Sequence, residues 1–229
     1  MKKIVITGAS SGFGRALAQI FSDKNIDIIN ISKSSSEFCN TNILVDFNKL
    51  TKLNEILKKN QDLLKNIDLI ILNAGELGKI ELSLDTSINR FLKSINVNLL
   101  SNKIIIDFFL NSQKKPCKFI AISSGAALKP YSGWLKYCVT KGALNQMISC
   151  YANENPSHFF LSLAPGLIKT NMQHNISKEN KIKFPDLKKF DDLFETMDTP
   201  QERAKLFFKY LNYLLSKSSG TFFDLREVD

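Results

Sequence analysis

The stretch Thr7-Gly8-Ala9-Ser10-Ser11-Gly12-Phe13-Gly14 follows a short apolar run and precedes a helix-like pattern. Gly8 permits a tight turn, Gly12 lets the backbone approach a ligand, and Gly14 lets the helix pack closely on the strand. The N–H groups and the dipole at the start of that helix favour an anion. The stretch therefore predicts a strand–turn–helix unit that binds phosphate, and a turn without a ligand is the alternative.

Apolar runs of strand length alternate with helix-like patterns along most of the chain. The expected strands are residues 4–7, 27–32, 42–46, 68–72, 118–123, 158–163 and 220–225. The expected helices are residues 15–22, 50–65, 87–110, 136–154 and 200–216. This order predicts parallel strands with crossover helices, an α/β fold. Its length of 229 residues predicts one domain, residues 1–229.

Residues 167–199 interrupt this alternation with a polar, lysine-rich stretch. Large apolar residues recur there at helical spacing, namely Phe184, Leu187, Phe190, Leu193 and Phe194. A disordered insertion is the alternative, but it would leave these side chains exposed. We therefore predict a substrate-binding lid of short helices.

Composition excludes several classes of protein. The net charge is +9, but the lysines are scattered and form no basic stripe, so we expect no nucleic-acid partner. No apolar run reaches the roughly 18 residues of a membrane span, and the N-terminus leads directly into the first expected strand. We expect a cytoplasmic protein with no membrane partner. The four cysteines and two histidines form no ligand cluster, so we predict no metal.

Tyr137 and Lys141 lie four residues apart on the expected helix 136–154, so their side chains share one face. A nearby ammonium stabilises a phenolate, and we expect it to lower the tyrosine pKa from its ordinary value of about 10. The pair predicts a site of proton transfer.

The sequence resembles the short-chain dehydrogenase/reductase family through T-G-x-x-x-G-x-G at residues 7–14 and Y-x-x-x-K at residues 137–141. The resemblance implies a single-domain Rossmann fold, a doubly wound parallel seven-stranded sheet with helices on both faces. It also implies a ketone reduction in which Tyr137 donates a proton and Lys141 holds the cofactor ribose. Ser124 and Asn98 complete the implied catalytic set, preferred over their neighbours Ser123 and Asn96 on spacing.

The cofactor preference is predicted from the end of the second expected strand, where an acidic residue would bind the ribose 2′-hydroxyl. Ser32 and Lys33 occupy that position, so we expect NADP(H), with NAD(H) as the alternative. In the other interpretation Lys33 is a solvated loop lysine. The residues implied to contact the cofactor are Thr7, Gly8, Ser10, Ser11, Gly12, Phe13, Gly14, Ser32, Lys33, Asp46, Phe47, Asn73, Ala74, Gly75, Tyr137, Lys141, Pro165, Gly166, Ile168 and Thr170.

Gly133-Trp134 and the ending Asp224-Leu225-Arg226 are similar to the branch of the family that contains sepiapterin and benzil reductases. This similarity implies a small-molecule carbonyl substrate, a ketone or diketone of aromatic or pterin-like kind. Substrate contacts are expected from Ser124, Trp134, Tyr137 and Met172.

Sugar or polyol oxidation stays open, and two further functions do as well. One is a 3-oxoacyl-(acyl carrier protein) reductase, because the surplus of lysine would attract an acidic partner. The other is a non-catalytic NADP-binding regulator. The resemblance further implies a homodimer or homotetramer that pairs through residues 87–110 and 136–154.

Overall fold

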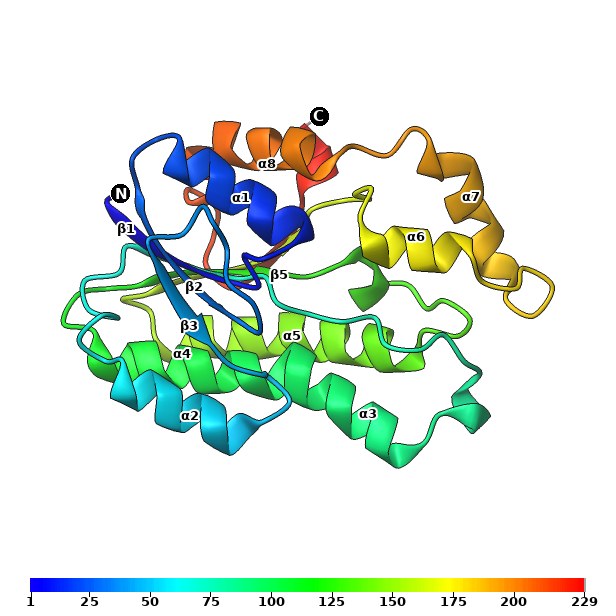
Figure 1. Cartoon of the computed structure of the whole chain (residues 1–229), viewed down its shortest axis with the longest axis horizontal. Coiled ribbons are helices and arrows are strands. Elements are labelled where there is room, and N and C mark those ends of the chain that lie inside the picture. The colour runs from blue at the N-terminus through cyan, green and yellow to red at the C-terminus, as the bar shows by residue number, and fades with distance from the viewer. Residues whose placement is uncertain (229) are drawn as a thin grey trace.

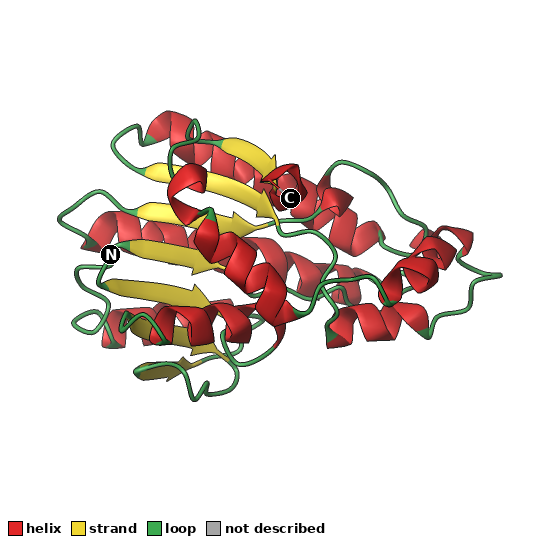
Figure 2. Ribbon diagram, turned by 90° about the horizontal axis from the view of Figure 1, so that it is seen from above, coloured by secondary structure: helices red, strands yellow, loops and turns green. Residues whose placement is uncertain are grey.

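The computed structural model describes residues 1–228. Seven strands form one sheet in the order β3-β2-β1-β4-β5-β6-β7, and every neighbouring pair is parallel. The strands are β1 (Lys3–Thr7), β2 (Asp27–Ser32), β3 (Thr41–Leu44), β4 (Leu69–Leu72), β5 (Lys118–Ile122), β6 (Phe159–Ala164) and β7 (Thr221–Asp224). All arrowheads in Figure 2 point the same way, so the carboxyl ends of the strands meet at one edge. The fold is the doubly wound Rossmann fold that the sequence predicts.

Helices cover both faces of the sheet (Figure 1). On one face lie α1 (Gly12–Ser22), α8 (Pro200–Lys209) and α9 (Leu211–Leu214). On the other lie α2 (Leu50–Lys59), α4 (Ser101–Ser112) and α5 (Leu135–Glu154). Because each parallel connection must cross over, helices accumulate on both sides and leave no face of the sheet in water.

The strands alternate between these two cores. In β1, Val5 packs with α2, α4 and α5, whereas Ile4 and Ile6 pack with α1 and α8. All three side chains are 0% exposed. The unbroken apolar runs in the sequence are therefore explained by burial on both faces of the sheet.

The expected helix at residues 87–110 is not continuous. It divides into α3 (Ile88–Ile95), one π-helical turn η2 (Asn96–Leu100) and α4. The buried side chains of Ser101 and Asn102 donate to the main-chain oxygens of Val97 and Asn98 at 2.7 and 2.8 Å. These bonds give two carbonyls of the π turn buried side-chain partners.

Other element boundaries also differ from the predictions. The helix expected at residues 50–65 ends at Lys59, where the Asn60 side chain donates to Ile56 O at 2.8 Å. The helix expected at residues 200–216 divides at Tyr210 into α8 and α9. The strands expected at residues 42–46 and 220–225 are β3 and the shorter β7. Polar side chains that compete for main-chain partners set such ends, and hydrophobic periodicity does not detect them.

Residues 167–199 fold into α6 (Asn171–Ser177), the 3₁₀ turn η4 (Pro185–Leu187) and α7 (Lys188–Phe194). The segment lies beyond the carboxyl ends of the strands (Figures 1 and 2). Its two ends meet at a parallel bridge between Ile168 and Asp198, and Lys169 N donates to Asp198 O at 2.8 Å. Phe184, the first of the five periodic apolar residues, is 2% exposed. The apolar spacing predicts short helices and not a disordered insertion, and the structure has short helices in this segment.

Within residues 1–228, no helix has the length and apolar content needed to cross a bilayer. The same residues contain no cluster of three or more His, Cys, Asp or Glu side chains suited to hold a metal ion.

We predict that Gly14→Ala destabilises the fold by about 1–3 kcal/mol, because a methyl group there would overlap the Gly8 carbonyl oxygen and the Asn73 amide. Urea denaturation measures the change. Gly125→Ala is the matched control, since a methyl group there meets nothing within 4 Å, and it should shift stability by less than about 0.5 kcal/mol. Equal stabilities of the two variants would contradict the packing argument.

Candidate active site

A cavity of about 850 Å³ opens at the carboxyl ends of the strands. The loops after β1, β2, β4, β5 and β6, the start of α5 and the segment α6–α7 all contribute to its wall. Most of the residues expected to bind cofactor or substrate line it, namely Gly8, Ser10, Ser11, Gly12, Phe13, Ser32, Lys33, Phe47, Asn73, Ala74, Gly75, Ser124, Trp134, Tyr137, Lys141, Pro165, Gly166, Ile168, Thr170 and Met172. Residues from distant parts of the sequence are therefore brought together in one place.

Four of the expected site residues do not line this cavity, and each lies just behind its wall. Thr7 is buried, and its Oγ1 accepts a hydrogen bond from Ala74 N at 2.9 Å. Gly14 packs against the Gly8 carbonyl. Asp46 pairs with Lys33, and Asn98 is buried behind the loop after β4. These four residues are placed to support the wall.

The glycine turn has the geometry of an anion site. Gly8 and Gly12 have φ angles of +70° and +53°, in the left-handed region that favours glycine. Ser11 precedes the first turn of α1, and its side chain makes no capping hydrogen bond. The first N–H groups of α1 thus remain available to an anion in the cavity. These features fit a dinucleotide pyrophosphate.

The loop after β4 is tied directly to this turn. Asn73 Nδ2 donates to Thr7 O at 3.0 Å and to Gly8 O at 3.2 Å. Gly8 N donates to Ile31 O at 3.0 Å, which joins the turn to β2 as well. Both neighbours of β1 therefore fix the position of the glycine turn.

Tyr137, Ser124 and Lys141 form one group at the inner end of the cavity. Tyr137 is 9% exposed, and its hydroxyl hydrogen-bonds the Ser124 side chain. Lys141 Nζ donates to Ile122 O at 2.7 Å and lies 5.6 Å from the centroid of the Tyr137 ring. Ser123, the neighbour of Ser124, donates instead to Asn145 Oδ1 at 2.6 Å.

The expectation that Lys141 lowers the Tyr137 pKa is wrong for this structure. Burial raises the pKa of Tyr137 to about 12, although the hydrogen bond to Ser124 opposes the rise. Burial also lowers the pKa of Lys141 to about 8. Both charged forms lose hydration inside the protein, and the Lys141 ammonium donates to a carbonyl and not to the phenol.

Asn98 is held inside the π turn by a full set of hydrogen bonds. Its Oδ1 accepts from Glu76 N at 2.8 Å, and its Nδ2 donates to Glu76 O at 2.9 Å and to Thr140 Oγ1 at 3.0 Å. A methyl group on Gly75 would lie 3.3 Å from Asn98 Oδ1 and 3.4 Å from Lys141 Nζ. Asn98 Oδ1 and Lys141 Nζ therefore both lie close to Gly75. Asn96, the other candidate, bonds Asn48 Oδ1 at 3.1 Å.

Aromatic side chains form the wall of the cavity beside Tyr137. Trp134 stacks on Phe190 with ring centroids 5.3 Å apart and meets Tyr137 edge to face at 5.9 Å. Tyr131 lies 4.8 Å from Trp134. The sequence predicts Phe190 in the lid, but neither Phe190 nor Tyr131 is among the expected site residues. For Phe190, the sequence feature that could have indicated a place in the site was its position in the periodic apolar pattern of residues 184–194.

Three basic residues of the cavity are paired with acids. Lys33 lies 3.2 Å from Asp46, and Lys169 lies 3.1 Å from Glu195. Arg226 Nε donates to Asp224 Oδ1 at 2.9 Å. Lys169 and Arg226 were not predicted as lining residues, because only the fold brings residues 169 and 226 to the same opening.

The depressed pKa of Lys141 predicts a pH-dependent stability. The unfolded chain binds a proton at Lys141 up to its ordinary pKa of 10.5, whereas the folded chain loses it from about pH 8. Wild-type stability should therefore rise, relative to Lys141→Met, by on the order of 2–3 kcal/mol between pH 7 and pH 10. Urea denaturation at both pH values measures this difference. Lys52→Met, on the surface of α2, should show no such change, and a constant difference for Lys141→Met would contradict the assignment.

Comparisons with known proteins agree with this arrangement. The family model described as short chain dehydrogenase matches residues 2–181. Benzil reductase from Bacillus cereus, which forms (S)-benzoin, is 31% identical over 85% of this chain and 87% of its own. Sepiapterin reductase from Bos taurus is 30% identical over 81% of this chain and 79% of its own.

A solved structure of a short chain dehydrogenase/reductase from Saccharomyces cerevisiae superposes with a TM-score of 0.87 at 23% identity. It covers 98% of this chain and 96% of its own, and it supports the fold alone. From the glycine turn, the Ser124–Tyr137–Lys141 group and these relatives, we conclude that the chain belongs to the short-chain dehydrogenase/reductase family, in the branch of sepiapterin and benzil reductases, whose members bind nicotinamide cofactors.

Proposed function

We propose that the protein is an NADPH-dependent carbonyl reductase that converts a ketone or diketone of aromatic or pterin-like kind to an alcohol. The observation that carries this proposal is the hydrogen-bonded pair of Ser124 and Tyr137 in a cavity that also holds Lys141 and an anion-binding turn. The relatives named as benzil and sepiapterin reductases support the same reaction class.

Tyr137 acts as the proton donor in this reaction. With a pKa of about 12 its phenol stays protonated at neutral pH, so it can give a proton to an oxygen that becomes negatively charged. Ser124 lies beside the phenol and donates a hydrogen bond to the same carbonyl oxygen. When bound, the nicotinamide supplies the hydride to the carbonyl carbon.

Lys141 stabilises the phenolate that remains after the proton has left. Its pKa of about 8 keeps most of the ammonium charged at neutral pH, yet lets it release a proton readily. We assign Asn98 a supporting role in a water-linked path that returns a proton to Lys141, because both side chains lie close to Gly75. The buried rings of Trp134 and Phe190 cover one side of Tyr137 and limit the water that reaches it.

The preference for NADPH rests on Lys33. Its ammonium lines the cavity at the end of β2, 3.2 Å from Asp46, and no carboxylate stands at the end of β2 itself to repel a 2′-phosphate. The lysine can turn from Asp46 to a phosphate, which offers more acceptors and more charge. The Asp46 pairing weakens this gain, so we expect a moderate preference, with NADH as a poorer cofactor.

A 3-oxoacyl-(acyl carrier protein) reductase is the second candidate, because basic residues do stand at the mouth of the cavity. Lys169 and Arg226, however, are already paired with Glu195 and Asp224. The aromatic wall built on Trp134 favours a flat conjugated substrate over a flexible acyl chain. The reading as a non-catalytic regulator is the least favoured, since the whole reacting group is present.

The protein is further proposed to form a homodimer or homotetramer through α4 and α5, as is usual in the family. We also propose a cytoplasmic location. The four cysteines are free thiols within residues 1–228, which is typical of proteins in reducing compartments.

We predict that Tyr137→Phe lowers kcat by about 10²–10⁴-fold while NADPH still binds, because the variant loses only the proton donor. NADPH oxidation is measured over a panel of benzil, smaller vicinal diketones, sepiapterin and an acetoacetyl thioester. Turnover of the thioester and of no other substrate in the panel would instead support a 3-oxoacyl-(acyl carrier protein) reductase. A loss smaller than tenfold would falsify the role of Tyr137.

We predict that Lys33→Ala raises the Kd for NADPH about tenfold and leaves the Kd for NADH within about twofold, because only NADPH carries the 2′-phosphate. Fluorescence titration with both cofactors measures the change, and NADH serves as the internal control. Equal effects on the two cofactors would show that Lys33 is a solvated lysine with no role in the choice.

A further inference from the structure

A cluster of three charged side chains lies beside the helical turn that carries Tyr137, and two of them are buried while Arg90 is exposed. Glu81 and Lys136 are 3% and 2% exposed, and Lys136 Nζ lies 2.8 Å from Glu81 Oε1. Arg90 Nε donates to the same oxygen at 2.9 Å. None of these three side chains lines the cavity. The proposed reaction therefore makes no direct use of them.

The burial of Glu81 and Lys136 is not explained by stability alone. Buried charges lose much hydration energy, and an apolar pair of similar size is often no less stable. Burial raises the pKa of Glu81, but hydrogen bonds from Lys136 and Arg90 outweigh that effect and hold the pKa below its usual range. The carboxylate thus stays ionised. What the ion pair adds over apolar packing is a fixed direction for each partner.

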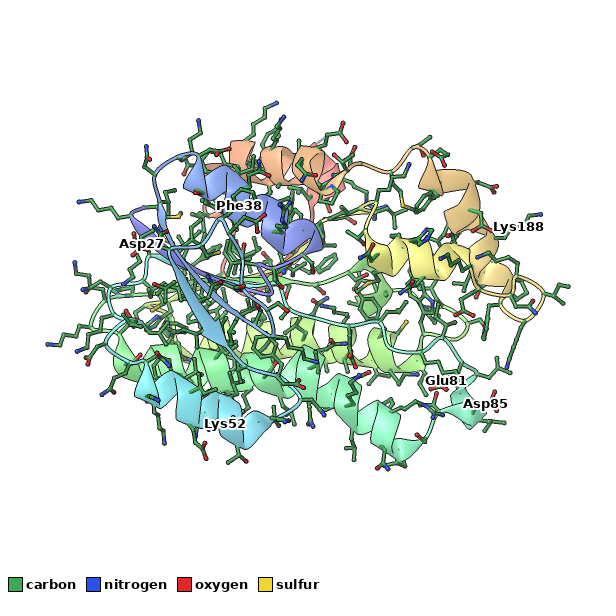
Figure 3. All side chains as sticks on the ribbon, viewed as in Figure 1. Asp27, Phe38, Lys52, Glu81, Asp85 and Lys188 are labelled. Atoms are coloured by element: carbon green, nitrogen blue, oxygen red, sulfur yellow. The ribbon has the colours of Figure 1, made fainter. Side chains whose placement is uncertain are left out.

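The cluster joins three segments of the chain. Glu81 lies in the loop after β4, Arg90 in α3 and Lys136 in the first turn of α5. Lys136 Nζ also donates to Lys79 O at 2.9 Å, and Glu81 N donates to Gly133 O at 3.2 Å. Figure 3 shows Glu81 close to Asp85, at the end of the molecule that also carries Lys188 of α7.

Lys136 connects this cluster to the reacting group through its own backbone. Its carbonyl oxygen accepts from Thr140 Oγ1 at 2.8 Å, and Thr140 Oγ1 accepts from Asn98 Nδ2 at 3.0 Å. Asn98 in turn holds the backbone of Glu76 at the cavity wall. One continuous series of polar contacts therefore runs from Glu81 to Asn98 through the helical turn that contains Tyr137.

The same region leaves little room for adjustment. A methyl group on Gly78 would lie 3.3 Å from Lys136 Cε, and one on Gly133 would lie 2.7 Å from Ile80 Cγ2. Dense packing transmits small shifts to neighbouring groups. A displacement of Glu81 or Lys136 would thus move the first turn of α5.

We propose that Glu81 and Lys136 are positioning residues whose ion pair fixes the first turn of α5 and so the reach of Tyr137 to the substrate carbonyl. This inference rests on the proposed function. Neither side chain contacts the reacting atoms, so both act through Tyr137 and the neighbouring Trp134. A misplacement of about 1 Å in a reacting group can cost about 10²-fold in rate.

The test compares Lys136→Met, which keeps most of the stem, with Glu81→Gln. Both variants should lose at least about tenfold in kcat while the Kd for NADPH stays within about twofold. The pH profiles of kcat should shift in opposite directions. Glu81→Gln leaves an extra positive charge and lowers the apparent pKa of the proton donor, whereas Lys136→Met raises it. Lys52→Met is the matched control, with the same change in an exposed ion pair to Glu55, and should have no effect.

The double variant Glu81→Leu/Lys136→Met separates positioning from simple stability, because it replaces the whole pair by apolar side chains. A folded double variant with a wild-type Tm and a low kcat supports positioning. A double variant with both wild-type Tm and wild-type kcat overturns it. Single variants that keep kcat within twofold, with pH profiles that superimpose on the wild type, overturn it as well.

Trp134 provides a readout that needs no turnover. It is the sole tryptophan of the chain, and its ring meets Tyr137 at 5.9 Å. Lys136→Met should shift its fluorescence emission, and Lys52→Met should not. If the wild type reduces no carbonyl, the proposed function fails, while the emission still decides the positioning role. An emission spectrum of Lys136→Met identical to the wild type would overturn that role.

Discussion

Burial of both faces of a parallel sheet is the constraint on which the rest of this structure depends. Residues such as Val5 and Ile6 point to opposite faces of β1, and each is 0% exposed, so helices must cover both sides. Parallel strands satisfy this requirement through crossover helices, and every strand then ends at the same edge. The loops that follow the strands meet there, and the cavity lies where they meet. The site thus arises from the way the core is covered.

Burial also sets the pKa values of the two groups to which the proposed reaction assigns proton transfer. The side chains of Tyr137 and Lys141 are both removed from water, which disfavours the charged form of each. The pKa of Tyr137 is therefore about 12 and that of Lys141 about 8. Such a phenol is a stable proton donor, and such a lysine exchanges protons near neutral pH. The Ile122 carbonyl and the Ser124 hydroxyl orient the two groups. In the proposed reduction, a bound cofactor and substrate then encounter groups whose positions are already fixed.

Buried polar contacts give the site its fixed geometry. The π turn presents Asn98 to the loop after β4, and the Asn102 side chain satisfies the Asn98 carbonyl at 2.8 Å. The proposed role of the Glu81–Lys136 pair extends this principle from the reacting group to the start of its helix. An apolar core would hold the same elements together with less precise direction, because dispersion forces have no preferred angle. Polar residues in these places cost stability and contribute alignment.

Local patterns in the sequence determined the fold class, the glycine turn, the Tyr137–Lys141 pair and the packed segment 167–199, because periodicity and short spacings are properties of neighbouring residues. The break of the helix 87–110 and the pKa of Tyr137 were not predictable in this way. The first depends on side chains of Ser101 and Asn102 that bond only when buried, and the second depends on how much water the folded chain excludes. The buried pair Glu81–Lys136, 55 residues apart in sequence, likewise exists only in the fold. Hydration and long-range contacts are properties of the tertiary structure, and only that structure decided them.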